Sequence, residues 1–418
     1  MNAVTASLNK PASRMALFFR KVFLDKLAGL DNAELSIIDS MGTTRLGKPA
    51  TDNLCATIQV NNLAFYQQVA LGGSVGAAEA YMDQYWQADD LCKVIQILVR
   101  NRDLLDSLEG GLALLTNQLL KIGHFFNRNS QEGSRKNIAA HYDLGNDLFE
   151  LFLDAHGMYS SATFYRPDVG LEQASVAKLE RICQKLALKP TDHVLEIGTG
   201  WGGFATYAAK VYGCKVTTTT ISKEQYKAAY KRITAAGVAG KVTVLLEDYR
   251  DLKGHFDKLV SIEMIEAVGH HYLDTYLKKC ADLLKPDGLA IIQAITIEDR
   301  YYKKALNSVD FIKRYIFPGS FIPCVSAIIN SSAHSTDLRL INLEDQGESY
   351  AHTLNSWRKN FMAALPKVRG LGYNEEFIRM WEFYLCYCEG GFLEKSISNV
   401  QLVFAKPDNR REQWLPNL

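Results

Sequence analysis

A glycine-rich segment directly after an apolar run has the clearest chemical meaning in this sequence. Residues 194–203 read VLEIGTGWGG, so a glutamate precedes glycines at positions 198, 200, 202 and 203. Glycine has no Cβ, and its backbone can therefore turn sharply at the end of a strand and approach a ligand closely. The segment predicts a buried strand followed by a nucleoside-binding turn.

The spacing of the glycines separates two classes of nucleoside ligand. Dinucleotide-binding turns read G-x-G-x-x-G and are followed about 20 residues later by a carboxylate that binds the ribose. Here the spacing is G-x-G-x-G-G, and the next predicted strand, 215–220, ends in threonines. The segment instead resembles motif I of the S-adenosylmethionine-dependent methyltransferases.

Apolar runs and helical patterns alternate after residue 137. Strands are expected at 194–197, 215–220, 241–246, 258–262 and 289–295, with helices that include 172–187, 222–236 and 272–284. This alternation predicts an α/β fold, a doubly wound and mostly parallel sheet with helices on both faces. Ligands bind such sheets at the carboxyl ends of the strands, where the chain places Gln225, Asp248, Glu266 and Gln293.

Two of these polar residues also have a structural explanation. Ser222 begins the helix 222–236 and has Gln225 three residues later, which is a capping-box pattern. Gln225 either completes this cap or turns towards a ribose. Asp248 either accepts a hydrogen bond from an adenine amino group or caps the turn that follows it.

Composition and charge limit the classes of function. The 418 residues are 47% hydrophobic and 22% charged with a net charge of +1, so no global field attracts the chain to nucleic acid. The eight cysteines include no C-x-x-C pair and none has zinc-ligand spacing, which predicts no metal site and a reduced, cytoplasmic protein. Residues 1–11 lack the apolar core of a signal peptide, and no apolar run is long enough to span a membrane.

The first 130 residues are expected to form a smaller α+β domain that contacts lipid or a second copy of the chain. Within it, 55–71 is expected to form strands, and 13–30 is a helix with an apolar stripe beside basic residues. The stripe either packs on the core or lies on anionic lipid. A polar linker is expected at 127–136, followed by a second domain over 137–406.

Several motifs taken together resemble one family. They are HYDLGND at 141–147, YSSA at 159–162, the glycine turn, Glu266, and FIKRYIFPG at 311–319. Over residues 55–406 the chain is similar to the cyclopropane fatty acyl phospholipid synthases and the mycolic acid methyltransferases. The resemblance implies a class I methyltransferase domain with a seven-stranded sheet and S-adenosylmethionine as cofactor. It further implies transfer of the sulfonium methyl to a double bond of an unsaturated phospholipid, then proton loss to close a cyclopropane, on the inner face of a membrane.

The resemblance also implies a bound bicarbonate ion that takes up the proton. Three of the groups that bind this ion in the family correspond to Glu266, Tyr350 and the backbone of Ile295 in this sequence. Two others differ, because Ser161 stands where the family has a cysteine and Gln293 where it has a histidine. Both still donate hydrogen bonds, but glutamine cannot take up a proton as histidine does. These departures leave open whether the chain holds bicarbonate and whether it closes the ring.

The implied cofactor contacts lie in four segments. They are Tyr159 and Ser160; Glu196, Gly198, Thr199, Gly200, Trp201 and Gly202; Thr220, Ile221, Ser222 and Gln225; and Asp248, Tyr249 and Arg250. Residues 141–144 are expected to cover the cofactor as part of a lid. Cys388 is carried over as a catalytic candidate, although the reaction needs no thiol and packing near an acyl channel explains this cysteine equally well.

Aromatic and basic residues alternate over 311–321, a pattern that suits either a bilayer interface or a core helix with a basic edge. Three other functions stay open: methylation of the alkene without ring closure, methylation of a soluble small molecule, and lipid binding without catalysis. The oligomeric state is also open, with a homodimer among the options.

Overall fold

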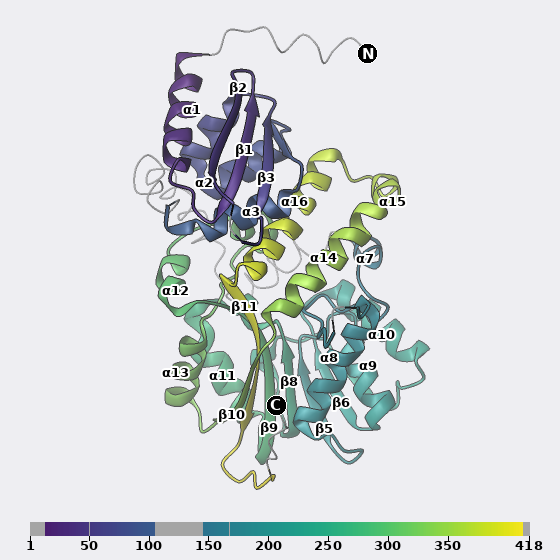
Figure 1. The fold of residues 1–418 in the computed structure, drawn as a ribbon. Helices are drawn as coiled ribbons and strands as arrows, with labels where there is room; N and C mark the ends of the chain where they lie inside the picture. The colour runs from purple at the N-terminus through teal and green to yellow at the C-terminus, as the bar shows by residue number, and fades with distance from the viewer. Residues whose placement is uncertain (1–12, 50, 105–144, 167, 413–418) are drawn as a thin grey trace. The chain divides into compact units, whose positions relative to one another are not determined.

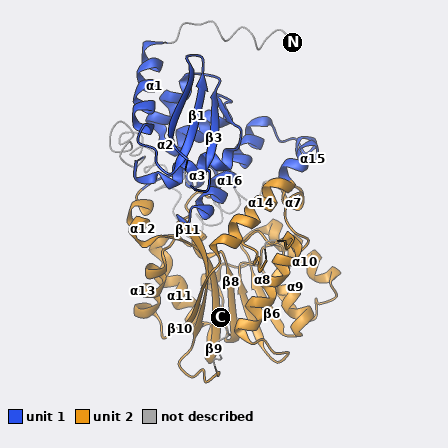
Figure 2. Ribbon diagram, in the orientation of Figure 1, with its two compact units in different colours: residues 1–126, 308–316, 361–396 blue, residues 127–307, 317–360, 397–418 orange. Residues whose placement is uncertain are grey.

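The computed structural model describes residues 13–49, 51–104, 145–166 and 168–412 (Figure 1). The chain divides into two compact units (Figure 2): unit 1 comprises 1–126, 308–316 and 361–396, and unit 2 comprises 127–307, 317–360 and 397–418. The linker expected at 127–136 and the lid expected at 141–144 lie outside the described residues. Among the described helices, none is long and apolar enough to cross a membrane.

Unit 1 contains a four-stranded mixed sheet with the strand order β2-β1-β3-β4. Its strands are β1 (Ala33–Asp39), β2 (Gly42–Lys48), β3 (Cys55–Val60) and β4 (Trp86–Ala88). Strands β1 and β3 are parallel, whereas β1 and β2, and likewise β3 and β4, are antiparallel. The helices of the unit are α1 (Arg14–Leu27), α2 (Ala64–Met82), α3 (Leu91–Arg100), the π-helical turn η5 (Ile312–Ile316), α15 (Leu365–Gly370) and α16 (Glu375–Leu393).

The strands expected over 55–71 are only partly present. Strand β3 ends at Val60, and α2 begins at Ala64 instead of a second strand. The Asn62 side chain explains the change, since its Oδ1 accepts a hydrogen bond of 3.0 Å from the Ala64 amide at the start of the helix. Gly73 interrupts α2 with a φ of 55°, which kinks the helix at this residue.

Helix α16 is the reason that the second domain is not one continuous stretch of chain. Gly390 packs so closely on α3 that a Cβ would lie 2.7 Å from Ile95 Cγ2. The Tyr81 hydroxyl donates to Glu382 at 2.9 Å, and the Arg379 guanidinium lies 3.8 Å from the centroid of the Tyr81 ring. Residues 308–316 and 361–396 therefore join unit 1 and interrupt the single domain expected over 137–406.

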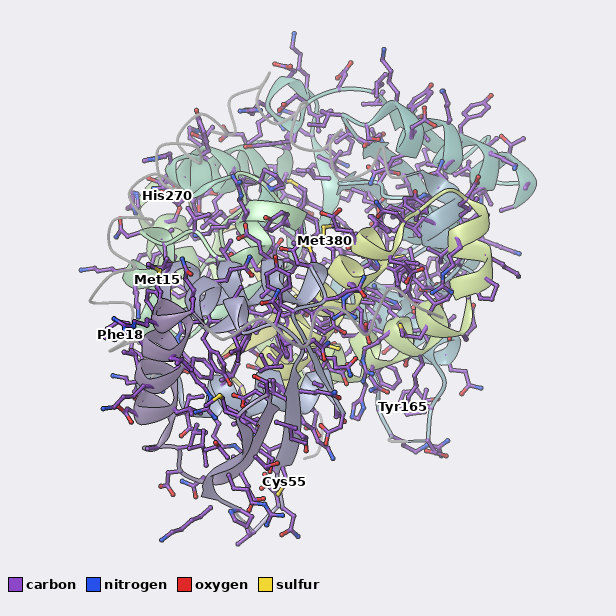
Figure 3. All side chains as sticks on the ribbon, turned by 90° about the horizontal axis from the view of Figure 1, so that it is seen from above. Met15, Phe18, Cys55, Tyr165, His270 and Met380 are labelled. Atoms are coloured by element: carbon purple, nitrogen blue, oxygen red, sulfur yellow. The ribbon has the colours of Figure 1, made fainter. Side chains whose placement is uncertain are left out.

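Helix α1 packs on unit 1 along only part of its apolar stripe. Phe19, Phe23 and Leu27 are buried, whereas the side chains of Met15 and Phe18 are each 57% exposed (Figure 3). The stripe expected over 13–30 is thus a core contact in its later turns and an exposed apolar surface in its first turn.

Unit 2 contains the seven-stranded sheet, with the order β10-β11-β9-β8-β5-β6-β7. Its strands are β5 (His193–Ile197), β6 (Lys215–Thr219), β7 (Val242–Leu245), β8 (Phe256–Ile262), β9 (Leu284–Ile297), β10 (Arg339–Asp345) and β11 (Ile397–Ala405). Strands β5 to β9 are parallel, and β11 is antiparallel to both β9 and β10. The expected mostly parallel α/β sheet is confirmed.

Helices cover both faces of this sheet, as Figure 1 shows. The described helices of unit 2 are α7 (Asn146–Glu150), α8 (Leu171–Leu186), α9 (Gly203–Tyr207), α10 (Lys223–Ala235), α11 (Leu273–Asp282), α12 (Asp299–Leu306), α13 (Val325–Ser335) and α14 (Gly347–Ala363). Alternate residues of β5 enter two different cores, because Leu195 packs with Leu277 of α11 and Val194 packs with Leu179 of α8. A strand buried on both faces accounts for the continuous apolar run in the sequence.

The strand β9 is longer than expected and contains an irregularity near its start. Phe256 pairs with Leu284, but Lys258 pairs with Leu289. Four residues of β9 therefore stand opposite one residue of β8, and the ladder is interrupted there. These residues, 285–288, have the sequence Lys-Pro-Asp-Gly, which suits a bulge because proline cannot donate to the ladder. The carboxyl-terminal part of β9, beyond the bulge, carries Gln293 and Ile295 of the site.

Candidate active site

The glycine turn follows β5 and is fixed to the end of β6. The amides of Gly198 and Thr199 both donate to the carbonyl of Thr219, at 3.1 and 2.9 Å. Gly200 has a φ of +50°, and a Cβ placed on it would meet no atom within 4 Å. The Thr199 hydroxyl is buried and has no hydrogen-bond partner among the described residues. A left-handed backbone beside open space and an unpaired hydroxyl fits a turn that binds the polar part of S-adenosylmethionine.

Glu196 stands just before the turn and faces the neighbouring strand. It pairs with Thr218 in the sheet register, and the Thr218 hydroxyl donates to its Oε2 at 2.6 Å. Burial raises the pKa of Glu196 to about 8, so the side chain is mostly protonated at neutral pH. Its contact with Thr218 holds the ends of β5 and β6 together beneath the turn.

The residues after β6 form a compact network at the start of α10. Ser222 is the N-cap, because its hydroxyl accepts from the Gln225 amide at 3.3 Å. The Gln225 side chain accepts from the Thr220 hydroxyl at 2.7 Å, and that same hydroxyl accepts from the Ser222 amide at 3.1 Å. The expected cap is confirmed, but Thr220 takes the reciprocal role that a capping box gives to Gln225. Ile221, between them, is half-buried.

Asp248 and Arg250 are paired after β7. The Arg250 Nε and Nη2 atoms donate to the two oxygens of Asp248 at 2.8 and 2.7 Å, and the Arg250 amide adds a third bond of 3.0 Å. Asp248 therefore caps the 3-10 turn η2 (Tyr249–Asp251), as the structural alternative expects. Tyr249 packs edge-on against Tyr276 at 5.6 Å and keeps partial exposure.

A carboxylate cluster lies at the carboxyl ends of β8 and β9, and Glu263 is its centre. Three groups donate to Glu263 Oε1: the Ser161 amide at 2.9 Å, Gln293 Nε2 at 2.8 Å and Asn399 Nδ2 at 2.8 Å. The Tyr350 hydroxyl donates to Oε2 at 2.8 Å. All four donor residues are buried, whereas Glu263 keeps some exposed surface. Four buried residues thus hold the carboxylate of Glu263 in one position.

The side-chain amide of Gln293 is oriented by a chain of hydrogen bonds that passes through Gln401 of β11. Lys185 Nζ donates to Gln401 Oε1 at 2.8 Å, and Gln401 Nε2 donates to Gln293 Oε1 at 3.0 Å. The Nε2 group of Gln293 therefore faces Glu263. The Ser161 hydroxyl, in contrast, donates to the Ala162 carbonyl at 3.0 Å, so Ser161 serves the cluster through its backbone and not through its side chain.

Glu266, three residues after Glu263, differs in its protonation. Its Oε1 accepts from the Ile295 amide at 2.5 Å, and its Oε2 is buried without a hydrogen-bond partner among the described residues. Burial and, after it, the nearby charge of Glu263 raise the pKa of Glu266 to about 8. Glu266 is therefore mostly a neutral acid at pH 7. Burial also raises the pKa of Glu263, and its hydrogen-bond donors offset only part of that shift.

Two of the residues in this cluster escape the sequence prediction. Glu263 is the first residue after β8, at the position where ligands bind such sheets, but it has no counterpart in the implied anion site. Lys178 of α8 is fully buried and donates to the Ser160 hydroxyl at 2.7 Å. Burial lowers the pKa of Lys178 to about 8, against the attraction of Glu263 and Asp154. Its signal in the sequence is a lysine four residues before Ile182, on the apolar stripe of its helix.

Aromatic rings stand next to these polar groups within unit 2. Tyr159 stacks on Trp357 with centroids 5.3 Å apart, and Phe149 lies 4.9 Å from Trp201. The indole of Trp201 donates to Asn146 at 2.8 Å, which fixes the ring beside the glycine turn. Gly202 allows α9 to approach α10, where a Cβ would lie 3.1 Å from Ala229. Such ring faces stabilise a positive charge and exclude water.

Two further expectations concern Cys388 and the segment 311–321. Cys388 belongs to α16 of unit 1, and burial raises the pKa of its thiol far above the ordinary value, which disfavours the thiolate form. Within the segment 311–321, Phe311, Lys313 and Phe321 are buried. Lys313 donates inward to the Ser308 carbonyl at 2.8 Å. These contacts favour the core alternative for this segment, in which Arg314 is exposed.

Comparisons with known proteins identify the family. The family model described as mycolic acid cyclopropane synthetase matches residues 129–402. The chain is 37% identical to the cyclopropane-fatty-acyl-phospholipid synthase of Escherichia coli, over 87% of this chain and 91% of that protein. It is 36% identical to the tuberculostearic acid methyltransferase of Mycobacterium tuberculosis, over 79% and 78% of the two chains.

Solved structures agree with these relatives. A cyclopropane synthase of Mycobacterium tuberculosis superposes with a TM-score of 0.61 and 29% identity, covering 65% of this chain and 98% of that one. A mycolic acid cyclopropane synthase complexed with S-adenosylhomocysteine gives a TM-score of 0.61 and 28% identity over the same shares. The chain belongs to the mycolic acid cyclopropane synthetase family of S-adenosylmethionine-dependent methyltransferases.

Proposed function

We propose that this enzyme transfers the methyl of S-adenosylmethionine to the double bond of an unsaturated phospholipid acyl chain and closes a cyclopropane ring. The relative from Escherichia coli, which matches most of both chains, supports the acyl-phospholipid substrate. The alternative readings, methylation of a soluble molecule and lipid binding without catalysis, have no comparable support.

One contact carries the proposal, because it brings the methyl donor and the proton acceptor together. Met264 stands between the two carboxylates in the chain, and its Cγ lies 3.3 Å from the position of a Cβ on Gly198. Strands β5 and β8 are direct neighbours, so their carboxyl ends form one edge of the sheet. The glycine turn and the carboxylate cluster are therefore parts of one site.

Each group at this edge has a distinct task in the proposed reaction. The turn from Gly198 to Gly202, with the residues after β6 and β7, holds the cofactor, which supplies an electrophilic methyl when bound. Trp201, Tyr159 and Trp357 exclude water and face the positive charge that develops on the alkene. A carboxylate of the cluster takes the proton that must leave before the ring closes.

The substrate lies in a bilayer, and we propose that the first turn of α1 contacts its surface. Met15, Leu17 and Phe18 are exposed there, as are Arg14 and Lys21 of the same helix. Figure 3 labels Met15 and Phe18. Apolar side chains with neighbouring cations suit the interface of a membrane that contains anionic lipid. Replacing Met15 and Phe18 by serine should reduce vesicle binding without changing cofactor affinity.

The function is tested by incubating the protein with labelled S-adenosylmethionine and vesicles of an unsaturated phospholipid. The proposed product carries the label as a CH₂ group and has lost its olefinic proton signals. A labelled acyl chain that keeps its unsaturation would instead establish methylation without ring closure. Transfer to water-soluble acceptors but not to vesicles would contradict the lipid substrate.

A further inference from the structure

The anion site implied by the sequence is filled by a side chain of the protein itself. Tyr350 and Gln293, which the resemblance assigns to bicarbonate, donate to Glu263 at 2.8 Å each. The Ile295 amide, assigned to the same ion, donates to Glu266. A bicarbonate ion needs these donors for its own oxygens, so it does not fit the cluster as it stands.

The backbone of Glu263 indicates that its position has a specific purpose. Its φ is +49°, in the left-handed region that non-glycine residues rarely adopt. Such a conformation costs about 1–3 kcal/mol and persists where surrounding contacts fix it, often at functional sites. Here the contacts are the four hydrogen bonds to the carboxylate, which come from separate segments of unit 2.

The charge balance around Glu263 favours a proton acceptor. The pKa of its carboxyl is raised overall, chiefly by burial, and the Lys178 cation, Gln293, the Ser161 amide and Tyr350 offset part of this shift. Three described donors converge on Oε1 but one on Oε2, so Oε2 retains acceptor capacity. A carboxylate with a raised pKa and remaining acceptor capacity on Oε2 is a competent general base.

We propose that Glu263 is the base of the reaction, built into the chain in place of an exchangeable bicarbonate ion. This inference rests on the proposed function and names the group that completes it. The enzyme thus needs no external anion for ring closure.

The proposed step balances as follows in atoms and charge. The bond from sulfur to the methyl breaks as the methyl bonds to one alkene carbon, which leaves the positive charge on the other carbon. One C–H bond of the new methyl then breaks. Its electron pair forms the third bond of the ring, and its proton goes to Glu263 Oε2. The products are the cyclopropane, neutral S-adenosylhomocysteine and one proton, which the protein later releases to water.

The first test uses the wild-type enzyme in buffer stripped of carbon dioxide, with bicarbonate added back in steps. Turnover on unsaturated phospholipid vesicles should be the same with and without bicarbonate. A rate that falls on stripping and returns with bicarbonate would overturn the proposal. This result does not depend on any variant folding.

The second test removes the carboxylate with Glu263→Gly, which suits the positive φ and opens space for an anion. Turnover without bicarbonate should fall by about 10²-fold or more, the usual contribution of a general base. Added bicarbonate should restore part of it. A folded Glu263→Gly that keeps wild-type turnover without bicarbonate would refute the role of this residue.

The matched control is Lys395→Gly, which replaces another non-glycine residue at a positive φ, +55°, on the exposed surface of unit 1. It should leave turnover and its response to bicarbonate unchanged. Calorimetry with S-adenosylhomocysteine confirms in each variant that the cofactor site is intact.

A binding measurement separates this inference from the proposed function. In NMR spectra with ¹³C-labelled bicarbonate, the wild type should show no specific binding, whereas Glu263→Gly should bind the ion. That pattern without transfer to any phospholipid would leave the carboxylate in the place of the anion but overturn the proposed substrate. Specific binding of bicarbonate to the wild type would overturn the inference alone.

Discussion

Tyr350 and Glu263 are joined by a hydrogen bond of 2.8 Å from the phenol of α14 to Oε2 of a residue at the end of β8. The bond places the phenol on the oxygen that accepts the fewest described hydrogen bonds. Tyr350 therefore controls how strongly Glu263 attracts a proton, and it does so from a buried position.

Replacing Tyr350 by phenylalanine should lower turnover by about 10- to 150-fold, because a lost hydrogen bond to a charged group corresponds to about 1.5–3 kcal/mol. The affinity for S-adenosylhomocysteine should not change. Loss of the donor also raises the pKa of Glu263, so the acidic limb of the rate profile should move to higher pH.

Steady-state kinetics across pH on vesicles test this prediction. Tyr212→Phe is the control, since the Tyr212 hydroxyl also donates to a carboxylate, Glu180, at 2.7 Å but away from the cluster. If Tyr350→Phe had the same turnover and the same pH dependence of turnover as Tyr212→Phe, the role of Tyr350 would be rejected.

Gly200 should be essential for cofactor binding and not for folding. A Cβ on this residue meets no protein atom, so Gly200→Ala obstructs only a ligand in the turn. Calorimetry should show a loss of affinity for S-adenosylhomocysteine of about tenfold or more.

The control for Gly200 is Gly237, an exposed glycine with a φ of +74° and equally open surroundings. Gly237→Ala introduces the same backbone strain far from the turn, so its melting temperature should fall as much as that of Gly200→Ala. Equal cofactor affinities in the two variants would show that no ligand approaches Gly200.

The sequence predicts the scaffold of the site better than its chemistry. Apolar runs identify β5 to β9, and the glycine spacing identifies the turn, because both depend on local patterns. The bulge at 285–288 and the helix that begins at Ala64 depend on single polar or proline residues, and these shift boundaries by a few positions.

The carboxylate cluster depends instead on contacts between distant segments. Glu263 obtains its donors from residues 161, 293, 350 and 399, and nothing local in the sequence indicates that these meet. Its left-handed backbone is equally invisible in the sequence. Lys178 is different, because a lysine on an apolar stripe is a local signal of a buried charge.

The two carboxylates of the cluster should respond differently to the same substitution. Since the pKa of Glu266 is raised to about 8, the residue is mostly neutral at pH 7, and glutamine is a close replacement for the neutral acid. Glu266→Gln should therefore keep turnover within about threefold at pH 7. Glu263→Gln should lose it, since an amide cannot accept the proton.

Kinetics at pH 7 for both variants, with calorimetry for cofactor binding, distinguish the two roles. A large loss of turnover in Glu266→Gln together with an active Glu263→Gln would exchange the assignments of the two residues.

Glu344 should make the melting temperature depend on pH in the acidic range. It accepts hydrogen bonds from Arg181 and from Lys185 Nζ, the latter at 2.6 Å, and these cations hold the pKa of Glu344 down at about 2. A carboxylate with a lowered pKa stabilises the fold fully above its unfolded pKa of 4.5, and this contribution is lost as the pH falls towards 2. Because the pair is partly exposed, the contribution is about 1–2 kcal/mol. Between about pH 6 and pH 3, the melting temperature should therefore fall less steeply with decreasing pH in Glu344→Gln than in the wild type.

Glu224→Gln is the control, since Glu224 forms an exposed pair with Lys227. The melting temperature of this variant should depend on pH as that of the wild type does. The same dependence in Glu344→Gln would mean that the ion pairs of Glu344 with Arg181 and Lys185 add nothing to the stability of unit 2.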